Sequence, residues 1–412
     1  MRFSRRPLLR SKTTVKAFRA RIVTPLSAPL IEDGLVRIDG DRIVEVVPYE
    51  GSAATDLGEV VLMPGLINAH CHLDYSCMRS AILPNASFSQ WIRRINDLKR
   101  TIDDDDYLAS IAAGFAELAA FGTTTVLNIE SFPELMFRLP QPPIRAWWFY
   151  EMLDVRNRIH TEDVVAGALS FFDARPGWPG GFGLSPHAPY TASAELYRLA
   201  CFCCEKHDMP LTTHVAESDE EFAMFQDATG RLHGFLSALG RDMSDTGQRT
   251  PLARLLDENC LPERAILAHM NYLAESDWDR LRGRAFSIVH CPGCHEYFDR
   301  PPFPIERFLA EGHNVCLGTD SLASNRALSM FAEMQTLKRA HPQFADSDIL
   351  DMTTRRAAQA IGMAGQLGVI EPGAHADLIS VPFSGPPNQA VSAIVAHTGR
   401  VEWSMVAGRR VG

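Results

Sequence analysis

Two histidines near residue 70 are the first candidates for chemistry. His70 and His72 end the segment Pro-Gly-Leu-Ile-Asn-Ala-His-Cys-His at 64–72, which follows the apolar run 60–63, typical of a buried strand. Side chains at positions i and i+2 of a strand point to the same side, so both imidazoles face one way. Two such nitrogen ligands are half of a zinc-type site. Because the chain has 14 histidines, this pair is informative only if further ligands occur elsewhere.

Polar residues also end several later strand-like runs. A lone histidine after an apolar strand is most simply a buried side chain with its hydrogen bonds satisfied. Here five of eight predicted strands end in His or Asp. In a parallel barrel all of these ends surround the same mouth, where reactions take place. The later residues are His214 with Glu217 three positions on, His269, His290 and Asp320.

Strand-like and helical runs alternate through most of the chain, which is the pattern of a closed parallel barrel. The span from about residue 60 to 350 fits the roughly 250-residue size of a (β/α)₈ TIM barrel. We therefore predict an α/β fold with a barrel domain at 60–359. The predicted strands are 60–69, 123–129, 144–153, 183–186, 210–215, 264–269, 285–290 and 314–318, and the clearest helices are 107–121 and 194–207.

Both ends of the chain are rich in short β runs. Gly40-Asp41 between two of these runs is a hairpin signal. We predict that residues 1–59 and 360–412 fold together into a small β-sandwich domain. The runs are 17–23, 34–38, 42–47, 376–381, 390–396 and 402–406.

Composition limits the class of protein. With 412 residues, 46% of them apolar and 22% charged, the chain can bury a large core. Its net charge of −10 argues against nucleic acid as a partner, and no apolar run approaches the roughly 20 residues of a membrane span. The basic start at residues 1–6 is followed by no long apolar core, so we read no signal peptide and expect a cytoplasmic protein.

Nine cysteines raise the question of disulfides, metal or redox chemistry. The odd count and the apolar surroundings favour free thiols in a reducing compartment. Cys291 and Cys294 form a Cys-x-x-Cys pair without a matching second half. We expect both to serve packing.

The chain resembles the amidohydrolase superfamily, and within it the branch of nucleoside and heterocycle deaminases and chlorohydrolases. The resemblance covers nearly the whole chain, including the predicted terminal domain. It rests on the order and spacing of five motifs: the segment 64–72, His-Val-Ala-Glu at 214–217, Ala-His at 268–269, His-Cys-Pro at 290–292 and Gly-Thr-Asp-Ser at 318–321.

The resemblance implies that His70, His72, His214 and Asp320 hold one divalent metal ion. Some relatives bind a second metal through a lysine that ends the fourth strand, but here that strand ends at His187 without a lysine. Three imidazoles and a carboxylate suit zinc, although iron or manganese would be accepted by the same donors. Such a metal lowers the pKa of a bound water toward neutrality and so supplies a hydroxide nucleophile.

The resemblance also assigns proton transfer. Glu217 would take the proton of the attacking water and deliver it to the ring nitrogen. His269 would orient the attacking oxygen, and Asp320 would pass a proton to the leaving ammonia. Taken alone, Glu217 could equally be a solvated residue in an acidic turn. Its position three residues after His214 favours the catalytic interpretation. The predicted activity is hydrolysis of a C–N bond other than a peptide bond, in an adenine-like nucleoside.

The substrate is expected to contact loops that follow the strands. The loops after the last two strands look most like those of aminodeoxyfutalosine deaminases of menaquinone synthesis and related S-adenosylhomocysteine deaminases, although Gly293 and Cys294 stand where Arg and Ser are common. Trp91 could equally be the core of a helix start. The expected substrate-binding residues are His187, Trp91, Arg156 (facing a distal carboxylate), His295 and Asn325.

Three alternatives stay open at this point. The same hydroxide attack serves hydrolytic dechlorination or cleavage of another C–N bond on a heterocycle. It also serves a guanine- or cytosine-type deaminase. A catalytically silent scaffold is disfavoured, since no metal or acid–base position is lost. The sequence leaves open whether the chain forms a homo-oligomer.

Overall fold

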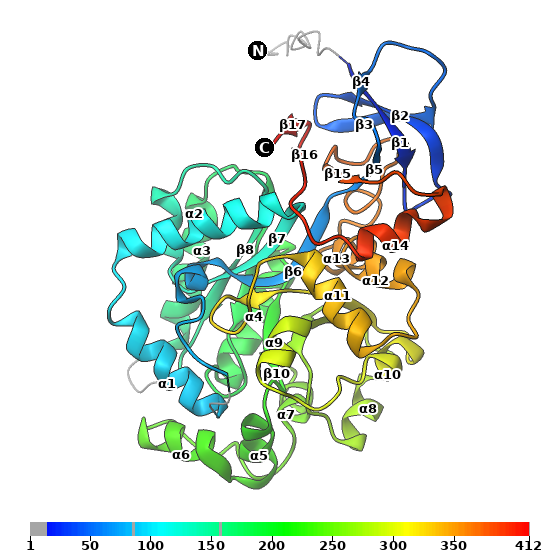
Figure 1. Cartoon of the computed structure of the whole chain (residues 1–412). Helices are drawn as coiled ribbons and strands as arrows, with labels where there is room; N and C mark the ends of the chain where they lie inside the picture. The colour runs from blue at the N-terminus through cyan, green and yellow to red at the C-terminus, as the bar shows by residue number, and fades with distance from the viewer. Residues whose placement is uncertain (1–14, 85–86, 156–158, 412) are drawn as a thin grey trace, which may run out of the picture.

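Strands from both chain ends form one mixed sheet at one end of the molecule (Figure 1). The computed structural model describes residues 15–84, 87–155 and 159–411, so the basic start at 1–6 and Arg156 lie outside the described residues. The order of the eight-stranded sheet is β17-β16-β15-β5-β1-β2-β3, with β4 beside β1. Its strands are β1 (Lys16–Val23), β2 (Ile31–Asp39), β3 (Arg42–Pro48), β4 (Thr55–Asp56), β5 (Val60–Pro64), β15 (Leu378–Pro382), β16 (Trp403–Val406) and β17 (Arg409–Arg410).

The predictions for the strands at the two chain ends are confirmed in part. The hairpin at Gly40 is confirmed, because β2 and β3 pair antiparallel on either side of it. The strand predicted at 390–396 is wrong: this segment is helix α14 (Ala390–Val395), which buries Ala390 and Ile394 one turn apart. The predicted sandwich is not confirmed, since the pairing places these strands in a single sheet. The domain boundaries at 59/60 and 359/360 stay a prediction.

A break at Gly65 divides the predicted strand 60–69 in two. β5 pairs with β1 and β15 in the terminal sheet, whereas β6 (Leu66–His72) begins the next sheet. A Cβ atom at Gly65 would lie 2.0 Å from Oγ1 of Thr124, so only glycine fits where the chain crosses between sheets. The single strand of the prediction is therefore wrong, because a run of apolar residues does not reveal which sheet each part joins.

Two runs of parallel strands follow. One sheet has the order β14-β6-β7-β8-β9 and the other the order β10-β11-β12-β13. A parallel bridge between Leu184 and Leu211 links the two runs, and the amide of Thr319 donates to the carbonyl of His70 (3.1 Å). This is an α/β fold of the TIM-barrel type. The strands are β7 (Thr123–Glu130), β8 (Arg145–Met152), β9 (Gly180–Pro186), β10 (Thr212–Val215), β11 (Ile266–His269), β12 (Ser287–His290), β13 (Asn314–Leu317) and β14 (Asp320–Ser321).

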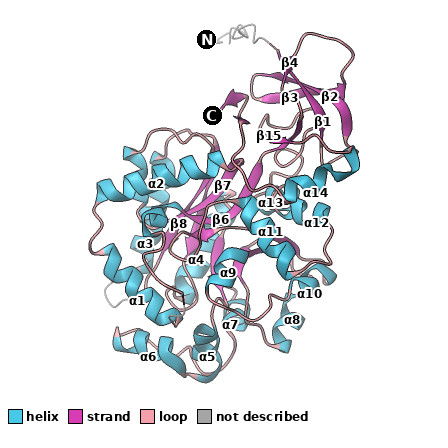
Figure 2. Ribbon diagram, viewed as in Figure 1, coloured by secondary structure: helices cyan, strands magenta, loops and turns pink. Residues whose placement is uncertain are grey.

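Helices cover the outside of the parallel strands (Figure 2). The helix predicted at 107–121 begins earlier, because Asp103 caps it and the carboxylates that follow complement the positive end of its dipole. The helices are α1 (Phe88–Lys99), α2 (Asp104–Ala120), α3 (Thr161–Ala174), α4 (Ala194–His207), α5 (Asp219–Asp227), α6 (Gly230–Ala238), α7 (Pro251–Asp257), α8 (Glu275–Leu281), α9 (Pro292–Tyr297), α10 (Ile305–Ala310), α11 (Met330–Ala340), α12 (Asp346–Met352) and α13 (Arg355–Ala360).

A buried ion pair ties the parallel strands to the terminal sheet. Arg145, at the start of β8, donates two hydrogen bonds to the carboxylate of Asp377 (2.8 and 3.1 Å). The same carboxylate accepts from the amide of Ala407 (2.7 Å). All nine cysteines are free, and Cys291 and Cys294 are both buried. No helix in the described part of the chain is long and apolar enough to cross a membrane.

Candidate active site

Three histidines converge at the carboxyl ends of two strands. His70 and His72 lie on β6, and His214 lies on β10. One ring nitrogen of each lies within 4.8 Å of the others, and all three side chains are buried. The Nε2 atoms of His72 and His214 are 3.2 Å apart. The convergence predicted from strand ends is therefore seen.

Asp320 completes this cluster from β14. Its Oδ1 lies 3.8 Å from Nε2 of His70 and 3.9 Å from Nε2 of His72. Its Oδ2 accepts a hydrogen bond from Oγ of Ser324 (3.0 Å). The hydroxyl thus fixes the carboxylate with one oxygen turned toward the imidazoles.

The donor set fits a divalent cation. Both ring nitrogens of His70 and Nδ1 of His72 are buried without a hydrogen-bond partner among the described residues. Burial lowers the pKa of both side chains well below the ordinary histidine value, so the rings are neutral and carry a free lone pair. His214 donates from Nδ1 to the carbonyl of His187 (2.7 Å), which leaves its Nε2 free to bind a metal.

A second group of side chains could transfer protons. Oε1 of Glu217 lies 3.8 Å from Nε2 of His269 and 3.1 Å from Nη2 of Arg300, and all three side chains are buried. Burial raises the pKa of Glu217, while the Arg300 guanidinium opposes that shift. A carboxyl group with a raised pKa exchanges protons more readily near neutral pH.

The loops that carry these residues are held tightly. The carboxylate of Glu221 accepts hydrogen bonds from the amides of Glu217 (2.7 Å) and Ala216 (3.2 Å). Ala216, His269 and Asp320 all have positive φ angles (51°, 73° and 58°). Non-glycine residues in this conformation store strain, which the surrounding contacts must hold. Such strain at three strand ends is typical of a functional site.

A cavity of about 690 Å³ opens from this cluster. Five buried residues of the two clusters line it: His72, His214, Glu217, His269 and Asp320. The rest of the lining includes polar and apolar side chains. Among the polar ones are Tyr75, Lys99, Tyr107, Ser131, Glu151 and His187.

Two of the predicted substrate residues line this cavity. His187 faces it and bonds through Nδ1 to Oγ1 of Thr191 (2.6 Å). Trp91 also lines it, but its Nε1 donates to the carbonyl of Ala323 (3.2 Å) and its ring stacks on Phe88. Trp91 is therefore both part of the packing of α1 and part of the cavity wall.

His295 and Asn325 do not line the cavity, which corrects the prediction for both. His295 donates from Nε2 to the carbonyl of Pro301 (2.7 Å). Asn325 donates to the carbonyl of Thr319 (2.7 Å) and to Glu333. Both residues hold the loops in place, because their polar atoms are already used within the protein. Arg156 lies outside the described residues.

Three residues of the site were missed from the sequence. Glu151 is the next-to-last residue of β8, so the rule that found the other residues near strand ends would have found it too. Lys99 lies at the end of α1, where its ammonium packs over the ring of Tyr75 (4.6 Å). Arg300 follows α9 at no diagnostic spacing, so no sequence signal pointed to its contact with Glu217.

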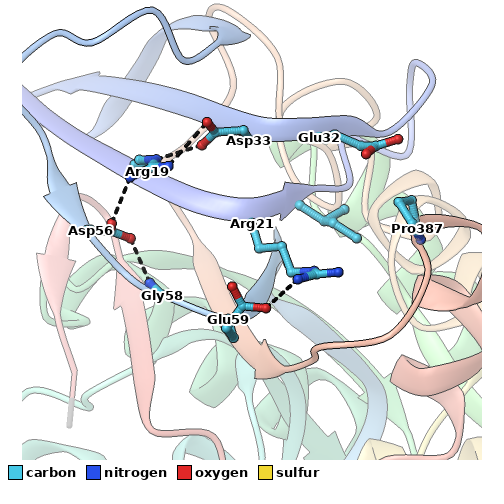
Figure 3. A pocket seen from close by; sticks show the side chains of 9 residues that line it. Arg19, Arg21, Glu32, Asp33, Asp56, Gly58, Glu59 and Pro387 are labelled. Atoms are coloured by element: carbon cyan, nitrogen blue, oxygen red, sulfur yellow. Dashed lines mark hydrogen bonds and ion pairs between the residues drawn. The ribbon is translucent and has the colours of Figure 1, made fainter.

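A second pocket lies on the terminal sheet (Figure 3). Its two arginines are already neutralised. Arg19 pairs with Asp33 and Asp56, and Arg21 pairs with Glu59. These pairs are exposed, so we assign the pocket no ligand.

Comparison with known proteins agrees with the site. Residues 61–411 match the sequence profile of the Amidohydrolase family. The chain belongs to the amidohydrolase family. A 5-methylthioadenosine/S-adenosylhomocysteine deaminase from Pyrococcus furiosus is 29% identical over 401 residues, which cover 93% of this chain and 90% of that relative.

Two crystal structures are similar throughout. An adenosine deaminase from Xanthomonas campestris with bound zinc has a TM-score of 0.82 at 25% identity, covering 96% of this chain and 92% of that one. Helicobacter pylori aminofutalosine deaminase has a TM-score of 0.84 at 21% identity, covering 97% of this chain and 100% of that one, and shows the fold alone. This amidohydrolase is thus a metal-dependent enzyme that hydrolyses C–N bonds.

Proposed function

We propose that this amidohydrolase deaminates an adenine-like purine nucleoside with the aid of one zinc ion. The observation that carries the proposal is the pairing of the His70–His72–His214–Asp320 cluster with the buried Glu217, where all of these residues except His70 line one cavity. The relative from Pyrococcus furiosus, named for two 5′-modified adenosines, supports the same substrate class.

His70, His72, His214 and Asp320 would hold the metal. A bound divalent cation supplies Lewis-acid activation of water for attack on the amino-bearing carbon. The strand that would carry a bridging lysine for a second metal ends instead in Ser185-Pro186-His187, which supports a single ion. Three nitrogens and one carboxylate favour zinc, with Fe²⁺ or Mn²⁺ as substitutes.

Glu217 is proposed to move the proton. It would accept a proton from the attacking water and deliver it to the ring nitrogen beside the reacting carbon, as a general acid–base catalyst does. Arg300 holds the Glu217 carboxylate in place by its 3.1 Å contact. His269, 3.8 Å from Glu217, would orient the attacking oxygen. A C–O bond would then form to the amino-bearing carbon. Asp320 would take the remaining proton of the attached hydroxyl group and pass it to the amino group, which leaves as ammonia when the C–N bond breaks.

The residues that line the cavity favour a nucleoside substrate with a modified 5′ position. His187 and Glu151 present polar atoms that can bond to ring nitrogens and sugar hydroxyls. A phosphate would need a cluster of unpaired cations. Among the described residues that line the cavity, Arg241 is bonded to Asp245 and to backbone carbonyls and Arg100 pairs with Asp97, so Lys99 is a single cation and not a cluster. Our first candidate is 6-aminodeoxyfutalosine, an intermediate of menaquinone biosynthesis.

We also propose that the parallel strands close into a (β/α)₈ barrel. The Leu184–Leu211 bridge supports the junction between β9 and β10, and the pairing of β14 with β6 supports the other junction. A closed barrel would bring all the strand ends of the site to one mouth. The cytoplasm remains the predicted compartment.

A screen for ammonia release tests the function. The panel contains adenine, adenosine, 5′-deoxyadenosine, 5′-methylthioadenosine, S-adenosylhomocysteine, 6-aminodeoxyfutalosine, guanine, cytosine and a chlorinated triazine. We expect ammonia from 5′-modified adenosines, with free adenine turned over far more slowly. Release of ammonia or chloride from the triazine, with none from any adenosine derivative, would overturn the proposal.

A further inference from the structure

The strand that carries two of the metal ligands contains a β-bulge beside His70. The pairing of β6 with β7 passes from Asn68 opposite Val126 to Cys71 opposite Asn128, so β6 advances by three residues while β7 advances by two. A bulge of this kind disturbs the regular ladder and re-aims the side chains next to it. At this point the amide of His70 donates to a side chain, Oδ1 of Asn68 (3.3 Å). Asn68 therefore supports the backbone of a metal ligand.

The same carboxamide binds the turn that leads into Asp320. Its Oδ1 accepts a second hydrogen bond from the amide of Thr319 (3.1 Å), and its Nδ2 donates to Oγ1 of Thr319 (2.7 Å). Because two backbone N–H groups point to one atom of the side chain, that atom must be the oxygen, which fixes the orientation of the carboxamide. One side chain thus bonds to the amide of the ligand His70 and to the residue before the ligand Asp320.

This contact is closed to solvent and tightly packed. Asn68 and Thr319 are both fully buried (0% exposed). A Cβ atom at Gly318 would lie 2.8 Å from Cβ of His70, so the turn approaches β6 more closely than a residue with a side chain allows. A buried N–H group without an acceptor is costly, so the backbone of His70 would shift if Asn68 were removed. The contact therefore controls where the ligand lies.

Another asparagine between strands shows what a structural role alone looks like. Asn314, the first residue of β13, donates from Nδ2 to Oγ of Ser287 (2.9 Å) and to the carbonyl of Arg356 (2.9 Å). It joins neighbouring elements as Asn68 does, but it lies at the amino end of its strand, whereas the metal ligands lie at carboxyl ends. Asn314 is therefore a matched control for the loss of a buried carboxamide contact.

We propose that Asn68 is a positioning residue of the metal site, whose carboxamide sets the separation of His70 and Asp320 and with it the affinity for a divalent cation. The inference rests on the proposed function, which assigns both side chains to the metal. Nε2 of His70 and Oδ1 of Asp320 lie 3.8 Å apart, on strands that Asn68 bridges. Asn68 is not one of the described residues that line the cavity, so it acts through the ligands and not on the substrate.

The test measures the zinc affinity of the demetallated full chain by competition with a chromophoric chelator. Asn68→Ala removes the whole contact and should weaken zinc binding by about 10–100-fold, the usual effect of a residue that orients a metal ligand. With saturating zinc, kcat for 5′-methylthioadenosine should fall, whereas KM should stay close to wild type because Asn68 touches no substrate. Asn314→Ala should keep the zinc affinity of wild type, even where it lowers the melting temperature.

Thr319→Val tests the same contact from its other side. This substitution removes the hydroxyl group that accepts from Nδ2 of Asn68 but keeps the backbone amide, so it should weaken zinc binding less than Asn68→Ala does. The double variant should lose less affinity than the product of the two single losses, because both substitutions remove the same hydrogen bond.

The outcomes separate the inference from the proposed function. Unchanged zinc affinity in folded Asn68→Ala, or in Thr319→Val where Asn68→Ala does not fold, would overturn the role of Asn68 alone. An equal loss of zinc affinity in Asn314→Ala would do the same, since it would show a general effect of stability. Failure of the wild-type chain to bind zinc would overturn both.

Discussion

Replacing Glu217 by glutamine separates proton transfer from metal binding. The amide has nearly the same shape as the carboxylate and can still accept a hydrogen bond from Arg300, 3.1 Å away. It cannot take a proton from water. Loss of one positioned acid–base group costs about 10²–10⁴ in turnover. At about 1.36 kcal/mol per factor of ten, the activation free energy should rise by about 2.7–5.4 kcal/mol.

The same substitution has a cost in stability. The side chains of Glu217 and Arg300 are only 6% and 3% exposed, so removal of one charge leaves the other uncompensated. Breaking a buried pair in this way costs up to about 3–5 kcal/mol of the free energy of unfolding. Because the glutamine keeps the hydrogen bond, we expect a loss at or below the lower end of that range. Activity should therefore be measured well below the melting temperature.

Three measurements on Glu217→Gln decide the matter: metal content, circular dichroism and ammonia release from an adenosine derivative. We expect metal occupancy equal to wild type, since the ligand cluster is untouched, and a loss of turnover in the range above. Glu263→Gln makes the same charge change at an exposed position and should behave as wild type. A loss of less than about tenfold with full folding would refute the role of Glu217 in proton transfer.

Other substitutions probe the metal, the sheet junction and the charge beside Glu217. His72→Ala should lose the bound metal and turnover together, measured by elemental analysis and ammonia release; full occupancy in this variant would exclude it as a ligand. Gly65→Ala should lower the free energy of unfolding by about 1–3 kcal/mol, because the added methyl group would overlap the buried Thr124. Adding Thr124→Ala to this variant should restore part of the lost stability. Arg300→Gln should move the acidic limb of the kcat/KM profile to higher pH: without the cation the pKa of Glu217 rises further, and its ionised form is lost earlier as the pH falls. An unmoved limb would show that this contact does not tune the carboxyl group.

The site residues on strands could be predicted from the sequence because the fold restricts where they lie. A polar residue at the carboxyl end of a parallel strand lies at the same mouth of the barrel, regardless of how the outer helices pack. His70, His214 and Asp320 were found in this way, although 250 residues separate the first from the last. Glu151 obeys the same rule.

Other features depend on contacts that a single sequence does not reveal. The break at Gly65 follows from the approach of Thr124, which is 59 positions away along the chain. The segment 390–396 has a short apolar pattern that suits a strand or a helix equally. His295 and Asn325 have the right residue types for a substrate, but their partners within the protein decide which way they face.

The most direct test of the central claim is a metal titration of the demetallated enzyme, followed by deamination of 5′-methylthioadenosine. If His70, His72, His214 and Asp320 form one catalytic metal site, metal-free protein should be inactive. Activity should then rise linearly with added zinc and reach its plateau at one ion per chain. Full activity without metal, or a plateau only at two ions per chain, would contradict the mononuclear mechanism.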